Sequence, residues 1–379
     1  MKRVIAFGAV LGCGLLAARC GGTTLQQGDG GTDASNDIKV VDVQPVDAPL
    51  DAPVDAGAPD APGEPPPPPD GGAPTTNVYT FAIDTIYLGE ASRTAVAPSS
   101  SAWKDYGYNL DGLVTTSSST NVCTLAAGAP KMNQVDGNNG IDNAWGSVLL
   151  PMVQSAMSLP TPSQTETTFI DQGNWTLQLQ IVGLSDDPTQ SALGLTAQIF
   201  MSGVYGGVPT FDSTTNWPVL STSVNDGQTI ASGSVAQFKS SYVNGGTFVS
   251  GPGPNPVVLP LDLQGIQFPL AIHNAVFSFD HVDHADAANG TIAGVLDTQE
   301  FLAALQKVAG FISPSLCGSA FAGIAQQVMQ ASDILTNGTN VPNTPCTAIS
   351  VGIGFTARLI ANPTQVVQAP PPAPDPCGG

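Results

Sequence analysis

Side chains that could bind a metal ion gather at two places in the chain. The first is Val135–Trp145, where Asp136, Asn138 and Asp142 flank a turn that contains glycine. Carboxylate and amide oxygens in such a turn are typical calcium ligands, so calcium is the cofactor that this loop suggests. The same residues would equally suit an ordinary turn in which Asn143 caps the following helix. Three side chains are too few for calcium, so this site would also need backbone carbonyls, water or a distant Asp.

This stretch resembles the calcium loops of EF-hand and dockerin-like repeats, in which alternate Asp and Asn side chains surround the ion. It departs from them because Gly140 stands where a ligand would be and Trp145 falls near the position of the bidentate Glu. The resemblance therefore implies weak binding, with a Kd of ~10⁻⁴–10⁻³ M, and a structural role for the ion.

The second place is Phe279–Asn289, which holds His281 and His284 among three Asp residues. On a helical turn the two imidazoles would share a face and could bind zinc or a similar ion. On a continuing strand they would point in opposite directions. A polar loop after a strand is the alternative, and no third ligand can be named from the sequence.

Signatures of the common catalytic sites are absent from the sequence. All three histidines lie within His273–His284, there is no G-x-S-x-G motif, and the E-x-D-x-E strand of sandwich-fold glycosidases does not occur. A GxGxxG fingerprint with an acidic partner and a P-loop are also missing, so we expect no nucleotide binding. We therefore assign no catalytic residue.

Aromatic side chains in Gly-, Thr- and Asn-rich segments are a further candidate for binding, because sugars stack on exposed rings. Tyr205 and Trp217 have the most favourable surroundings. The alternative is that the rings close the ends of a sandwich. The full set is Trp103, Tyr106, Tyr108, Trp145, Trp175, Tyr205, Trp217 and Tyr242.

The first 22 residues predict export. Lys2 and Arg3 precede a short apolar run that ends in small residues and cysteine, as in a secretory signal peptide. Cys20 at its end resembles the lipidated cysteine of bacterial lipoproteins, although Arg19 departs from the usual small residue before it. Cys13 is the alternative. By the same resemblance Gly21 favours the outer membrane, and we expect residues 1–19 to be removed.

A linker is predicted over residues 20–77, because this segment is rich in Asp, Ala and Pro and has no apolar periodicity. The lipidated cysteine with such a linker resembles the surface lipoproteins of myxobacteria. The chain has 10 basic and 30 acidic residues and a net charge of −20, so nucleic acid is not an expected partner. The lipid anchor would instead hold the protein on the membrane.

Short alternating runs between Gly- and Pro-rich turns predict a mainly β domain over residues 78–367, an antiparallel β-sandwich or jelly roll. About three helices interrupt it, two of them near the C-terminus, and residues 368–379 form a Pro-rich disordered tail. The expected strands are Val78–Leu88, Trp175–Ile181, Leu193–Met201, Val257–Leu263, Ala271–Phe279 and Thr347–Leu359. The expected helices are Ala144–Met157, Gln299–Val308, for which Asp297 or Thr298 is the expected N-cap, and Ser319–Leu335.

Four cysteines follow the signal peptide, and in an exported protein they are candidates for disulfides. Cys317 precedes a predicted helix and Cys346 precedes a predicted strand, so a chain that folds back would join these two. Cys123 would then be free or paired with Cys377.

These observations favour a lipid-anchored cell-envelope protein that presents an extracytoplasmic β-rich binding or structural domain. An envelope protein or a glycan would be its partner. The alternatives are a secreted metal-dependent hydrolase that uses His281 and His284, and a glycan-binding module.

Overall fold

The computed structural model describes residues 63–94, 98–157, 159, 161–263, 266–371 and 374–377. The predicted signal peptide, the linker up to residue 62 and the lipidation candidates Cys13 and Cys20 lie outside these residues.

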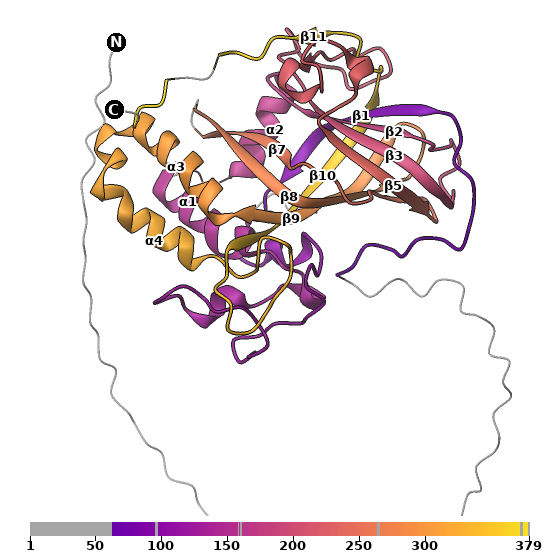
Figure 1. Ribbon diagram of the computed structural model, residues 1–379. Coiled ribbons are helices and arrows are strands. Elements are labelled where there is room, and N and C mark those ends of the chain that lie inside the picture. Colours follow the sequence, from indigo (N-terminus) through magenta and orange to yellow (C-terminus); the bar gives the residue numbers. More distant parts are fainter. Residues whose placement is uncertain are drawn as a thin grey trace, which may run out of the picture. The chain divides into compact units, whose positions relative to one another are not determined.

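The described part of the chain is mainly β, as predicted, and its strands are antiparallel in one large sheet (Figure 1). The nine strands follow the order β6-β5-β3-β2-β1-β10-β9-β8-β7, and β6 also pairs with β8. Eight strands therefore form a closed ring of pairings, and β7 pairs with the first part of β8 outside this ring. The strands are β1 Val78–Tyr87, β2 Leu177–Val182, β3 Ala192–Met201, β5 Ala236–Asn244, β6 Thr247–Val249, β7 Val257–Leu263, β8 Ile266–His281, β9 Asp286–Asp297 and β10 Ala348–Ile360. The short β4 Val219–Leu220 and β11 Val366–Val367 pair in parallel beside the large sheet.

Large apolar side chains from the strands fill the interior of this closed sheet. Phe248 stacks on Phe279 with ring centroids 5.1 Å apart, and Phe238 meets Phe277 edge to face at the same distance. All four rings are at most 1% exposed. Aromatic pairs of this kind stabilise a core by more than the burial of their apolar surface alone. The interior of the ring of strands is therefore filled by packed side chains here.

The described residues form four α-helices outside the strands, and α1, α3 and α4 gather on one side of the sheet in Figure 1. They are α1 Leu150–Met157, α2 Pro162–Asp171, α3 Thr298–Ile312 and α4 Ala322–Gln330. The predicted cap of α3 is confirmed, because the Asp297 carboxylate accepts the amides of Gln299 and Glu300. The helix α2 was not predicted, since its sequence is mostly polar and has no apolar stripe.

Strand β10 is covered on both faces, although its alternating sequence is typical of a strand with one wet face. Ser350, Gly352 and Gly354 are all buried. The chain at Tyr106 and Gly107 crosses directly over Gly352, where a Cβ atom would overlap the Tyr106 backbone. Small residues on this face therefore allow a second layer to approach the strand.

Parts of the segments that were predicted as linker and tail make specific contacts with the domain. Residues 63–77 lie against the domain, and the Leu193 amide donates to the Gly72 carbonyl at 3.2 Å. At the other end, Cys377 is bonded to Cys317 and Ala369 donates to the Ser221 hydroxyl. Composition alone predicted disorder for both segments, because specific contacts with a folded surface do not appear in composition.

Candidate functional site

The predicted disulfide between Cys317 and Cys346 is wrong. Cys346 is bonded to Cys123, with a Cα–Cα distance of 5.2 Å, and Cys317 is bonded to Cys377 at 5.0 Å. The chain after α4 does fold back, but it meets the segment after Cys123. There Thr124 donates to Thr344, and Cys346 donates to Thr124. The separation of 223 residues between Cys123 and Cys346 explains why local spacing did not reveal the pair.

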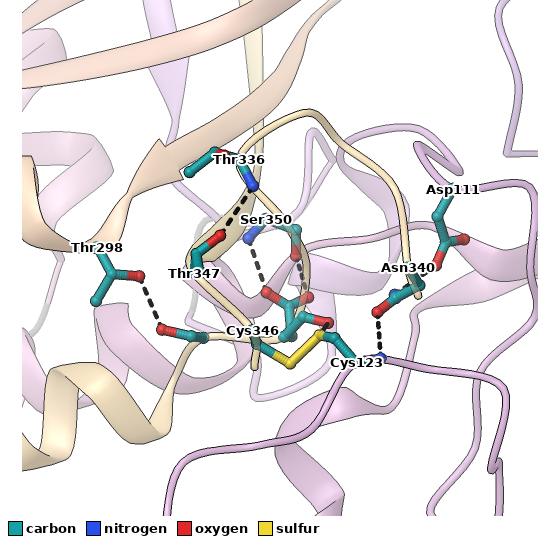
Figure 2. Close-up of a disulfide and its surroundings, with 10 residues drawn as sticks. Asp111, Cys123, Thr298, Thr336, Asn340, Cys346, Thr347 and Ser350 are labelled. Atoms are coloured by element: carbon teal, nitrogen blue, oxygen red, sulfur yellow. Dashed lines mark hydrogen bonds between the residues drawn. A yellow bond between two sulfur atoms is a disulfide. The ribbon is translucent and has the colours of Figure 1, made fainter. Parts of the chain in front are cut away.

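Cys346, which is bonded to Cys123, lines one wall of a groove with a volume of about 530 Å³. Figure 2 shows the disulfide with Thr298, Thr336 and Thr347 close by. The floor is held by a hydrogen bond of 2.8 Å between the Thr298 and Ser332 hydroxyls, both of which are buried. The groove is lined by Thr124, Leu125, Ala126, Asp297, Thr298, Gln299, Met329, Ser332, Thr336, Pro345, Cys346 and Thr347. We call this set the disulfide groove.

Polar and apolar groups are mixed in the disulfide groove. Gln299 and Thr336 are exposed, and Met329 is 37% exposed. Met is flexible and polarizable and can adapt to different partners. Amide and hydroxyl groups supply both donors and acceptors, so the groove is suited to an uncharged polar ligand or a peptide segment.

A smaller cavity of about 160 Å³ adjoins the disulfide groove, and Asp297 lines both. Glu300, which lines this cavity, lies 2.6 Å from Nε2 of His273. A carboxylate orients an imidazole in this way in many hydrolases. The hydrogen-bond partners that the structure gives His273 and Glu300 do not include a hydroxyl or thiol nucleophile, so this pair by itself does not point to hydrolysis.

The three predicted calcium ligands have separate partners. Asp136 accepts a hydrogen bond from the Thr115 amide, and Asp142 accepts from the Leu110 amide at 2.7 Å. Asn138 is exposed and donates to Asp105 at 2.5 Å. These hydrogen bonds account for the turn without an ion. Calcium binding at this loop stays a prediction.

Asp136 and Asp142 nevertheless belong to a cluster of carboxyl groups that the sequence did not reveal. Burial, together with the neighbouring carboxylates of Asp111 and Asp333, raises the pKa of Asp136 to about 7 and that of Asp142 well above its ordinary value. Burial also raises the pKa of Asp333 to about 7, although the Ser350 hydroxyl and amide oppose this shift. In the described part of the chain, no three His, Cys, Asp or Glu side chains are placed to hold a metal ion.

The two predicted histidine ligands lie in different surroundings. His281 ends β8, is 1% exposed, and its Nε2 lies 2.8 Å from the Ser185 carbonyl. His284 is exposed in the bend that follows. The strand ends at His281 and the chain bends before His284. The helical turn that would place both imidazoles on one face therefore does not form.

Four of the eight predicted sugar-stacking aromatics are in the core. Tyr106, Trp145, Trp175 and Trp217 are at most 3% exposed. Trp103 is half-buried and lines a cavity of about 340 Å³ together with Pro98, Ser99, Ser100, Ser147, Pro151 and Gln154. Trp103 therefore borders a cavity that also presents hydroxyl and amide groups.

Sequence reasoning also missed Glu166, which is 2% exposed on α2. Its Oε1 accepts the Asp262 amide of strand β7 at 2.7 Å, and burial raises its pKa to about 8. It lines a cavity of about 10 Å³, the size of one water molecule. Its place in a polar stretch of sequence gave no signal of burial.

Comparisons with known proteins identify no family for this chain. No family model, curated protein or solved structure matches it. Among the described residues, no helix is both long and apolar enough to cross a bilayer.

Proposed function

We propose that this chain is an exported, lipid-anchored cell-envelope protein whose β-rich domain is a binding or structural module. The observation that carries the proposal is the pair of disulfides, Cys123–Cys346 and Cys317–Cys377. Disulfides persist in oxidising compartments such as the periplasm and the cell surface. Together with the apolar run before Cys20, they support export.

The disulfide groove supports binding as the role of the domain. It is of the size usual for ligand pockets, and a covalent bond holds its wall in place. A site that is already formed loses less entropy when it binds. The partner would be an envelope protein or a glycan.

The anchor is tested with the variants Cys20→Ser and Cys13→Ser of the full chain. We expect the wild type and Cys13→Ser to partition into the detergent phase, and Cys20→Ser to become soluble. Acyl chains contribute ~0.8 kcal/mol per buried CH₂ group, so loss of the acyl chains should be decisive. Loss of partitioning in Cys13→Ser alone would assign the anchor to the other cysteine, and no change in either variant would refute lipidation.

A glycan-binding module is the second candidate, and the Trp103 cavity favours it. An indole face beside serine hydroxyls is suited to a sugar ring. A glycan array with wild type, Trp103→Ala and Gln299→Ala tests this candidate. Loss of binding in Trp103→Ala alone would place the sugar at the Trp103 cavity, and loss in Gln299→Ala alone would place it in the disulfide groove. No glycan bound by the wild type would favour a protein partner.

A further inference from the structure

A run of five prolines, Pro65–Pro69, lies against the domain in the segment that was expected to be a linker. Proline fixes its own φ and restricts the residue before it, so consecutive prolines adopt the polyproline II helix. Proline also has no backbone N–H. A surface that recognises such a run must therefore supply hydrogen-bond donors to its carbonyl groups.

Strand β5 supplies these donors. The Tyr242 hydroxyl donates to the Pro66 carbonyl, and the Asn244 amide donates to the Pro67 carbonyl at 3.0 Å. Both side chains point away from the core, because Val243 between them is fully buried. Proline-rich segments dock on aromatic side chains in other recognition domains, and Tyr242 supplies an aromatic ring here.

The proline side chains agree with docking along one edge. Pro65, Pro66 and Pro69 are half-buried, while Pro67 and Pro68 are exposed. A polyproline II helix has three residues per turn, so Pro66 and Pro69 lie on the same edge of that helix.

Glycines at both ends of the run permit close contact with the domain. Gly63 has φ +113° and Gly72 has φ +106°, which other residues rarely adopt. A Cβ atom on Gly63 would overlap the Asn139 carbonyl, and one on Gly72 would overlap the Ser191 carbonyl. The Gly63 carbonyl also accepts the Asn109 amide at 2.6 Å. These close backbone contacts at both ends of the run indicate that it docks specifically on the domain.

We propose that the outer face of β5 around Tyr242 and Asn244 is a polyproline-binding site, filled by the Pro65–Pro69 run of the same chain. The site recognises the carbonyl groups of a polyproline II helix, so it accepts a separate proline-rich peptide of the same sequence when its own run is removed. The argument rests on contacts within the domain and is independent of the lipid anchor.

The test uses the full chain with Pro65–Pro69 replaced by five serines. A labelled peptide with the sequence of residues 63–72 is added, and fluorescence anisotropy measures binding. We expect the peptide to bind the serine variant and not the wild type, in which the site is filled. Adding Tyr242→Phe to the serine variant should weaken binding about two- to tenfold, because one hydrogen bond is lost. A peptide with serines in place of the prolines is the control and should not bind.

Equal binding to the wild type and the serine variant would place the peptide elsewhere and overturn the proposal. Failure of a folded serine variant to bind the peptide would also overturn it. If the serine variant does not fold, the wild type and Tyr242→Phe are compared by cleavage before Asp70 with a protease specific for Asp. Faster cleavage of Tyr242→Phe supports docking through the hydroxyl, and equal rates contradict it.

Discussion

The buried carboxyl group of Glu166 accepts a hydrogen bond from a backbone amide of strand β7. Strand β7 lies at the end of the sheet order, and its Asp262 amide donates to Glu166 on α2. A buried amide without an acceptor would cost ~1–3 kcal/mol. The carboxyl group prevents this loss, but its ionised form is poorly solvated there.

We predict that Glu166 makes the domain less stable as the pH rises. Its pKa is about 8 in the folded protein against an ordinary value of 4.5, so the protonated form favours folding. This stabilisation is complete below pH 4.5 and is lost as the pH rises to about 8. Between about pH 5 and pH 9 the Tm of the wild type should fall further than the Tm of Glu166→Gln. The difference between the two falls should be 4 °C or more, since ~1 kcal/mol corresponds to 2–4 °C. The exposed Glu300→Gln is the control, and parallel curves for all three proteins would contradict the prediction.

The carboxyl cluster of Asp136, Asp142 and Asp333 should respond to pH in the same direction. With raised pKa values the protonated forms favour the folded state, so stability falls as the pH rises from 3.8 to about 7. Asp136→Asn should reduce this fall, as measured by thermal melting at several pH values. A melting curve of Asp136→Asn that falls as steeply as the wild-type curve would show that Asp136 is not the group that titrates.

Calcium gives a separate test of the same cluster. Above pH 7 the ionised carboxylates would attract the ion, and about 10 mM calcium would be a hundredfold over a Kd of ~10⁻⁴ M. Binding would then stabilise the domain by ~2.7 kcal/mol relative to EDTA. The double variant Asp136→Ala/Asp142→Ala is the control. Identical melting of the wild type in calcium and in EDTA would leave this stretch as a turn without a metal.

At the scale of elements, β10 depends on glycine to accept a second layer of chain. We predict that Gly352→Ala destabilises the domain by ~1–3 kcal/mol, because its methyl group must displace the Tyr106 backbone. Urea denaturation measures the change. Gly323→Ala is the matched control: Gly323 lies in α4 with open space around its Cα, so alanine should stabilise by up to ~1 kcal/mol. If Gly352→Ala leaves the free energy of unfolding unchanged, the chain at Tyr106 can move away from β10 without cost.

At the scale of the whole molecule, two disulfides join segments that are far apart in sequence. Non-reducing peptide mapping should recover Cys123 with Cys346 and Cys317 with Cys377. Removing the first pair as Cys123→Ala/Cys346→Ala should lower the free energy of unfolding by ~3–5 kcal/mol, since it closes the longer loop. It should also loosen the wall of the disulfide groove. A peptide that links Cys317 to Cys346 would contradict the structure.

Local pattern was enough to predict the elements that carry their own signal. The alternating apolar residues of β1, β3, β7 and β10 predicted strands at nearly the observed bounds. Asp297 before a helix-forming stretch predicted the start of α3, because a cap acts within one turn. Strand β9 was missed, since Asp286–Asp297 is buried almost throughout and has no alternation.

The sequence by itself determined the mainly β class, the acidic charge and the presence of six cysteines. These are properties of composition and of short-range periodicity. Only the tertiary structure decided which cysteines pair, that the ring of strands closes from β6 to β8, and that Pro65–Pro69 docks on β5. It also decided that Trp217 is buried while Trp103 borders a cavity. Each of these depends on which distant segments come into contact, and burial and pairing between distant residues follow from the packing of the whole chain.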